Sequence, residues 1–147
     1  MTGTNFSLSG NDAGNYSLSS VSTTTASISA WTLRGFYSPV DMSSTSTIVW
    51  NTVKNGSTVP LKFNVFAGTT ELTSTADIQS FSAVKVTCSS GSEDAIEEFA
   101  TTGGTNLRYS DGKFIQNWAT PKAINTCYKV TVTTKDASTI SAYFKLK

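Results

Sequence analysis

Four acidic side chains gather in one short stretch of the chain, and they are the first candidates for chemistry. They are Glu93, Asp94, Glu97 and Glu98. Their oxygens could hold Ca²⁺, but the stretch lacks the regular Asp/Asn/Gly spacing of an EF-hand loop. A solvated acidic turn is the alternative, and the spacing favours it. The oxygen-rich stretch Asn11–Asn15 is likewise expected to be a plain turn rather than an ion site.

Catalytic chemistry is restricted by the absence of one residue type. The chain contains no histidine. This removes the Ser-His-Asp triad, the Cys-His dyad and His-ligated zinc, together with the usual general base near neutral pH. A glycosidase would need two carboxylates at a defined separation across a cleft, whereas the main acidic group here lies in one stretch. We therefore expect no enzymatic activity, no catalytic residue, no cofactor and no metal.

Charge and hydropathy exclude two kinds of partner. Eleven basic and ten acidic side chains leave a net charge of +1, which gives no strong field for nucleic acid or an acidic membrane surface. No run of 18 or more apolar residues occurs, so membrane insertion is not expected.

Large aromatic side chains are the candidates for binding a ligand, because sugars stack on exposed rings. Core packing is the competing use of such residues. Trp118 is expected in the core, in a strand that also holds Phe114. Phe36 and Tyr37 precede Pro39 in a linker-like stretch, so they are kept, with Trp31, as candidates for ligand contact.

Two cysteines, Cys88 and Cys127, remain to be explained. They are too far apart for a CxxC redox motif or a zinc knuckle. In a Ser/Thr-rich β-chain they indicate one structural disulfide and an oxidising compartment, and two buried free thiols in a reducing cell are the alternative. A bridge would close a loop of 39 residues, which the chain-entropy model values at about 4 kcal/mol. Cys127 is out of phase with Tyr128 and Val130, which places the bridge at a strand end.

The elements that must position these residues are strands. Ser and Thr make up 46 of 147 residues, and charged residues only 14%; Thr favours strands and Ser favours turns. Apolar residues recur with period two, which predicts antiparallel strands with one buried face.

Val84 and Val86 are expected to face the core, with Lys62 and Lys85 in the polar phase. A polar-phase Lys62 argues against an intramolecular isopeptide cross-link, because that lysine would have to be buried. The runs are Thr58–Phe66, Ser82–Cys88, Lys113–Trp118, Tyr128–Thr133 and Ile140–Leu146.

Turn signals separate these runs at intervals of roughly 8–12 residues, which indicates a sandwich or a barrel. Tyr109–Lys113 contains Asp-Gly and predicts a tight hairpin. The other signals are Asn55-Gly56, Ala67-Gly68, Gly103-Gly104 and Lys135–Ser138.

Several segments, in order, resemble the PxKF domain, and the motif itself reads Pro60-Leu61-Lys62-Phe63. The resemblance covers residues 34–147. It implies an Ig-like module of a long secreted or surface protein of bacteria, with a disulfide at Cys88 and Cys127 and no catalytic activity. The matching segments are Gly35–Asp41, Trp50–Phe63, Ala95–Glu98, Leu107–Tyr109, Trp118–Lys122, Thr126–Cys127 and Ala142–Phe144.

The first part of the chain resembles a different kind of repeat. Phe6–Leu18 is similar to the closing strands of YDG and MBG-type repeats of bacterial adhesins. Residues 1–33 are therefore expected to be a strand-rich remnant or junction of a preceding repeat. Their alternating strands should dock on the sandwich or be taken up by a neighbouring molecule.

Together these observations predict an all-β, Ig-like antiparallel β-sandwich with an extra strand-rich N-terminal segment. The expected function is a non-catalytic extracellular structural or adhesion module of a larger bacterial secreted or cell-surface protein. The expected partners are neighbouring domains of the same polypeptide, with a glycan or another surface protein as further options. Two alternatives stay open: a carbohydrate- or cell-wall-binding module, and a strand-exchanging assembly subunit.

Overall fold

The computed structural model describes residues 7, 9–15, 29–44, 47–92 and 107–147. Within these residues the chain forms nine strands and two short 3₁₀ turns, and no α-helix. The strands are β1 (Thr32–Tyr37), β2 (Trp50–Val53), β3 (Thr58–Ala67), β4 (Thr70–Leu72), β5 (Ile78–Val86), β6 (Leu107–Ser110), β7 (Lys113–Ala119), β8 (Cys127–Thr134) and β9 (Thr139–Leu146); the 3₁₀ turns are η1 (Ala13–Asn15) and η2 (Thr75–Asp77).

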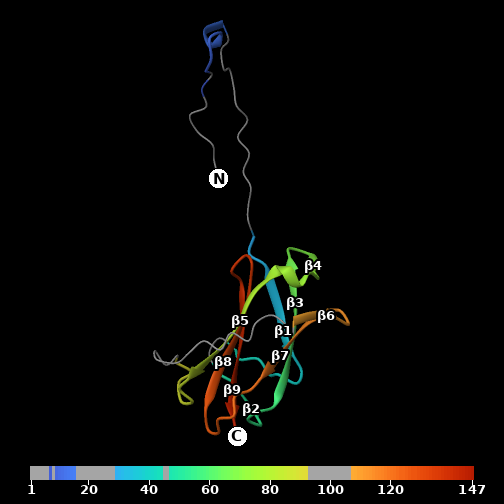
Figure 1. Cartoon of the computed structure of the whole chain (residues 1–147), viewed down its shortest axis with the longest axis vertical. Helices are drawn as coiled ribbons and strands as arrows, with labels where there is room; N and C mark the ends of the chain where they lie inside the picture. Colours follow the sequence, from blue (N-terminus) through green and yellow to red (C-terminus); the bar gives the residue numbers. More distant parts are fainter. Residues whose placement is uncertain (1–6, 8, 16–28, 45–46, 93–106) are drawn as a thin grey trace.

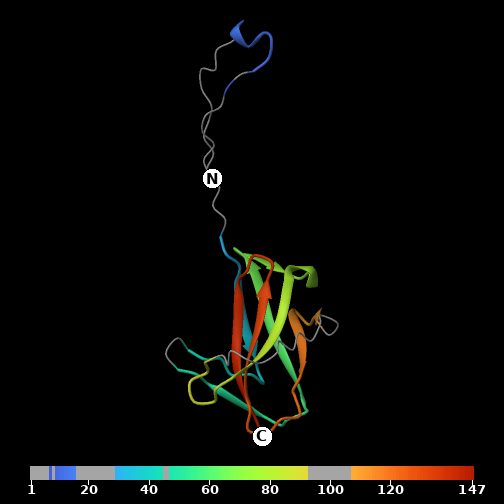
Figure 2. The same ribbon diagram turned by 60° about the vertical axis from the view of Figure 1, so that its left-hand side comes forward.

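The strands form two sheets that pack face to face (Figures 1 and 2). Sheet A has the order β1-β3-β7-β6, with β4 also paired to β3, and sheet B has the order β2-β9-β8-β5. The expectation of an all-β, Ig-like β-sandwich is confirmed by this architecture. The described chain enters the sandwich at one end, where β1 begins, and the C-terminus lies at the other end.

One pair of strands departs from the expected antiparallel arrangement. β2 and β9 run parallel, with Trp50 opposite Tyr143. No hairpin joins these two strands, so no tight turn imposes opposite directions on them. The buried Asn51 side chain reinforces the pairing: its Nδ2 donates to the Tyr143 carbonyl at 3.1 Å and to the Asp41 carbonyl at 2.8 Å.

The core lies between the sheets and is built from the alternating residues of β3, β7, β8 and β9. The predicted phase of these four strands is confirmed. Sheet A contributes Leu61, Phe63, Val65, Phe114 and Trp118, and sheet B contributes Val130, Val132, Ala142, Phe144 and Leu146.

Strand β5 contradicts the predicted phase. Val84 and Val86 are buried, but the β5 residues in the shared core are Phe81 and Ala83. Both pair with core residues of β8. Val84 and Val86 therefore lie on the opposite face of sheet B, and Lys85 shares the phase of the core residues instead of the polar phase. The reason is that β5 carries apolar side chains on both faces, so its pattern does not define which face is inside.

The turn predictions that fall on described residues are confirmed. Asp111 and Gly112 both have positive φ, at 53° and 69°, and join β6 to β7 as a tight hairpin. Turns also occur at 55–56, 68–69 and 135–136. Gly103-Gly104 lies outside the described residues, as do most of the strands expected before residue 29. η1 forms a turn at the predicted place. Thr32 and Leu33 belong to β1 and pair with β3, whereas the docking of residues 1–28 stays a prediction.

A carboxylate at the β8–β9 turn holds the beginning of the sandwich. Asp136 accepts hydrogen bonds from the Trp31 backbone N–H at 2.6 Å, from the Thr134 hydroxyl, and from the Ser138 hydroxyl and N–H at 2.8 and 3.2 Å. Burial acts to raise the pKa of Asp136, but these hydrogen bonds outweigh it and hold the pKa well below the usual range.

Acid should therefore weaken the fold through Asp136. A group whose folded-state pKa is depressed stabilises the fold above its unfolded pKa, about 3.9 for Asp, and this contribution is lost as the pH falls through the folded value. We expect Asp136→Asn to lower the melting temperature at neutral pH, with a difference from the parent that shrinks between about pH 4 and pH 2. Asp41→Asn, at an exposed aspartate, is the control. A pH-independent difference would contradict this role of the charge.

Candidate functional site

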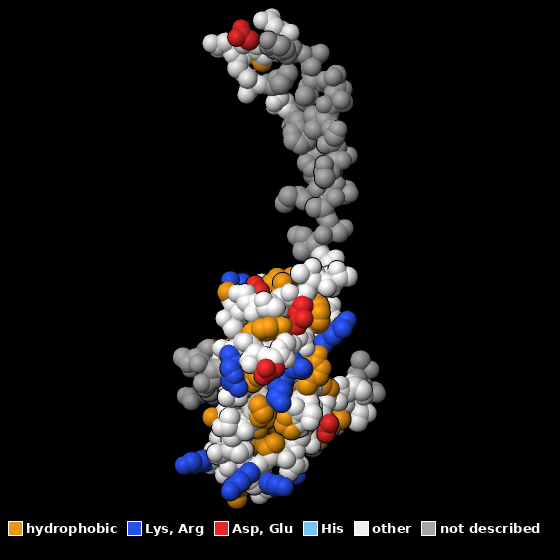
Figure 3. Space-filling view, turned by 90° about the vertical axis from the view of Figure 1, so that its right-hand side faces the viewer, with side chains coloured by type: hydrophobic (Ala, Val, Ile, Leu, Met, Phe, Trp, Pro, Cys, Tyr) orange, Lys and Arg blue, Asp and Glu red, His pale blue; other side chains and the backbone are white. Residues whose placement is uncertain are grey.

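A hollow of about 240 Å³ lies on the outer face of sheet A, beside the β6–β7 hairpin. Figure 3 shows the side of the sandwich that carries β4 and β6, where basic, acidic and hydrophobic side chains are interspersed. The hollow is lined, among the described residues, by Tyr37, Ser38, Lys62, Ser110, Asp111, Lys113 and Ile115.

The register of the strands brings these side chains together. Tyr37 of β1 is opposite Lys62 of β3, which is opposite Ile115 of β7. Residues directly opposite one another share a face of the sheet, so these three form one row across its outer surface. Lys113 adds a second cation at the hairpin, and its Nζ lies 5.6 Å from the centroid of the Tyr37 ring. This distance is within the range of a cation–π interaction.

Gly35 sets the orientation of the two aromatic residues that follow it. Its φ is +116°, and a Cβ at this position would lie 2.8 Å from the Lys62 carbonyl oxygen and 3.2 Å from the Phe63 Cα. Backbone atoms cannot yield to such a contact, so only glycine fits here. The register shifts at this point, between Gly35 and Tyr37. Phe36 consequently enters the core while Tyr37 faces outward.

The three aromatic residues predicted as ligand contacts are placed in three different environments. Phe36 is in strand β1 rather than a linker and is 3% exposed, with its ring edge-on to Phe63 at 5.9 Å. It therefore cannot offer a stacking surface. Trp31 is half-buried against the core, and its backbone N–H donates a hydrogen bond to Asp136. Tyr37 is half-buried and lines the hollow.

The other predicted residues are accounted for as follows. In the PxKF motif, Pro60 and Lys62 are half-buried and Phe63 is fully buried. Glu93, Asp94, Glu97 and Glu98 lie outside the described residues. Among the residues that the structure describes, no group of three or more His, Cys, Asp or Glu side chains could hold a metal ion.

The predicted disulfide is confirmed. Cys88 and Cys127 are bonded, with their Cα atoms 5.3 Å apart. Cys88 follows β5, and Cys127 is the first residue of β8. The bridge thus lies at a strand end, as the phase of Cys127 predicts.

The sequence reasoning missed two residues, a lysine that lines the hollow and a buried glutamine of β7. Lys113 becomes part of the hollow only because the hairpin folds it back over Tyr37. Gln116 is 2% exposed, although it is polar. Its signal was present in the sequence, since it occupies the apolar phase of β7 between Phe114 and Trp118.

Comparisons with known proteins add little to this geometry. No protein-family model matches the sequence. No curated protein matches it either. A solved structure described as "Crystal structure of Dpr1 IG1 bound to DIP-eta IG1" is similar to the chain, with 14% sequence identity and a TM-score of 0.28, covering 76% of this chain and 100% of that chain. A TM-score this low carries no argument, and the fold class rests on the two sheets and their shared core.

Within the described part of the chain, no helix is long and apolar enough to cross a membrane.

Proposed function

We propose that this chain is a non-catalytic extracellular module that spaces or displays other parts of a larger bacterial secreted or cell-surface protein. The Cys88–Cys127 disulfide carries the proposal, because disulfides form and persist in oxidising compartments and are rare in the cytosol. The proposal includes membership of the PxKF family, preceded by a tail of the YDG or MBG type. Its principal partners are the neighbouring domains of the same polypeptide.

The arrangement of the chain suits this task. The described chain enters the sandwich at one end, and Lys147 lies at the other (Figures 1 and 2). Modules joined at opposite ends form a row, so each one adds its length to the distance spanned. The disulfide links the end of β5, the edge strand of sheet B, to β8 beside it. A covalent link at an edge strand opposes unfolding and proteolysis.

Protease treatment of intact cells tests the proposed location. Cells that make the protein are treated with a membrane-impermeant protease, and the released peptides are identified by mass spectrometry. We expect peptides of this chain to be released without lysis, and Cys88 and Cys127 to be alkylated only after reduction. A cytoplasmic protein of the same cells is the control for lysis. Protection from the protease, with both thiols free in the native protein, would contradict the proposal.

The hollow beside Tyr37 supports a second candidate, a carbohydrate- or cell-wall-binding module. The half-buried Tyr37 ring could contact a sugar, and the ammonium groups of Lys62 and Lys113 could bind an anionic substituent on it. The hydroxyls of Ser38 and Ser110 add hydrogen-bonding groups. The Asp111 carboxylate in the same lining opposes an anion, but the two ammonium groups outnumber it, so an acidic glycan is the ligand class that fits this combination.

A glycan array separates the two candidates. If the hollow binds an acidic glycan, we expect Tyr37→Ala and Lys113→Ala each to weaken binding at least about tenfold, a loss typical of a central contact residue. Lys145→Ala, at an exposed lysine of sheet B, is the matched control and should leave binding unchanged. An array on which the parent binds no acidic glycan would exclude the second candidate.

A further inference from the structure

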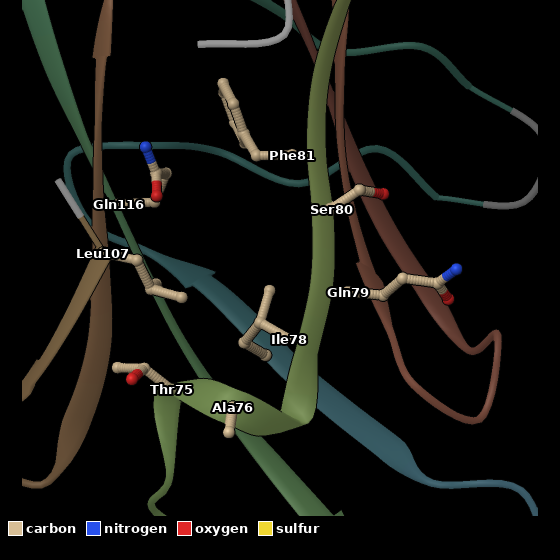
Figure 4. A pocket seen from close by; sticks show the side chains of 8 residues that line it. All are labelled: Thr75, Ala76, Ile78, Gln79, Ser80, Phe81, Leu107 and Gln116. Carbon is tan, nitrogen blue, oxygen red and sulfur yellow. The ribbon is translucent and has the colours of Figure 1, made fainter. Parts of the chain in front are cut away.

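A second pocket lies between the two sheets, on the side where β5 and β6 are the edge strands. Its volume is about 260 Å³. In Figure 4 the side chains of Ile78 and Leu107 extend toward one another from opposite sheets, with Phe81 and Gln116 beyond them. Gln79 and Ser80 point to the other side of β5. The described residues that line it are Thr75, Ala76, Ile78, Gln79, Ser80, Phe81, Leu107 and Gln116.

Gln116 is the unusual member of this lining. It is opposite Leu61 on one side and Leu107 on the other, so the inner face of sheet A has an amide in a row of leucines. The side chain is 2% exposed. The hydrogen bond that the structure gives it within the described residues runs from its Nε2 to the Asn117 carbonyl, at 3.2 Å.

The Gln116 carbonyl oxygen Oε1 is therefore a buried acceptor to which no described residue donates. A buried polar group without a partner destabilises a protein, and such groups are rare. Leucine would continue the row without this cost. A donor carried by a molecule in the pocket would give this acceptor a partner.

We propose that this pocket binds a small uncharged molecule with an apolar body and one hydrogen-bond donor, which is directed at Gln116 Oε1. The apolar body contacts Ile78, Phe81 and Leu107. The described lining contains no charged side chain, so an ionic ligand would be desolvated without compensation. The volume is below the roughly 300–1,000 Å³ of a typical ligand pocket, which limits the ligand to about one ring with its substituents.

Phenol and toluene are matched probes for this pocket, because they share a ring and only phenol can donate a hydrogen bond. NMR titration of the whole protein should show phenol shifting the amide signals of Ile78, Phe81 and Leu107. Toluene should bind at least about tenfold more weakly, since a site that hydrogen-bonds a ligand group rejects the analogue without it. Equal affinity for the two probes, or no shift at these amides with either, would overturn the proposal.

Gln116→Leu tests the acceptor itself. We expect this substitution to raise the melting temperature of the ligand-free protein, because it removes a buried acceptor to which no described residue donates, and to abolish the preference for phenol over toluene. Thr52→Leu, at an exposed position of β2 outside the described lining of the pocket, is the control and should leave the preference unchanged. A folded Gln116→Leu variant that keeps the preference, or that melts at a lower temperature, would contradict the assigned role. The probe comparison on the parent protein tests the proposal even where the variant fails to fold.

Discussion

Replacing Phe63 by alanine is expected to lower the free energy of unfolding by about 3–5 kcal/mol, the usual cost of emptying a large aromatic site in a core. Phe63 is 0% exposed. Its ring is edge-on to Phe36 at 5.9 Å and stacked on Phe114 at 5.4 Å, so its loss removes two aromatic contacts as well as buried area. Denaturant unfolding followed by fluorescence measures the change.

The neighbouring residue is a matched control. Lys62 precedes Phe63 in β3 and projects from the opposite face of sheet A, into the outer hollow. Lys62→Ala should change stability by no more than about 0.5 kcal/mol, as for most surface substitutions. Comparable losses for the two variants would show that the alternation along β3 does not separate a core face from an outer face.

The sequence pattern was sufficient for the strands whose two faces differ. In β3, β8 and β9, apolar residues recur at every second position over most of the strand, and the structure buries most of that set. β5 shows where this reasoning fails. Phe81 and Ala83 enter the core, while Val84 and Val86 are buried on the other face. A strand buried on both faces carries no periodic signal that identifies its inner side.

The sites were harder to predict than the strands, because they depend on pairing between distant parts of the chain. The outer hollow combines Tyr37, Lys62 and Lys113 from three different strands. The parallel pairing of β2 with β9 likewise has no local signal. Gln116 is different, since a polar residue at an apolar-phase position could have been noted in the sequence. The sequence does not show, however, that Gln116 lines a pocket between the two sheets.

Removing the disulfide by the double substitution Cys88→Ala and Cys127→Ala is expected to lower the free energy of unfolding by about 4 kcal/mol. The bridge closes a loop with a sequence separation of 39 residues. In the chain-entropy model, its loss releases that loop in the unfolded ensemble and thereby stabilises the unfolded state. Denaturant unfolding of the parent and the variant without reductant measures the difference.

Reduction of the parent protein separates the covalent link from the side chains that form it. Cys127 is 1% exposed, so its truncation to alanine also removes packing, whereas reduction of the parent leaves both sulfur atoms in place. We expect the reduced parent to lose most of the stability that the variant loses, and the variant to be insensitive to reductant. Protease resistance should be highest for the oxidised parent, lower for the reduced parent and lowest for the variant, since cleavage follows the population of opened molecules. If the oxidised and reduced parent proteins differed by less than about 1 kcal/mol, the loop would be contributing far less than its length predicts. The disulfide would then give no mechanical support to the proposed role of this sandwich as a spacer.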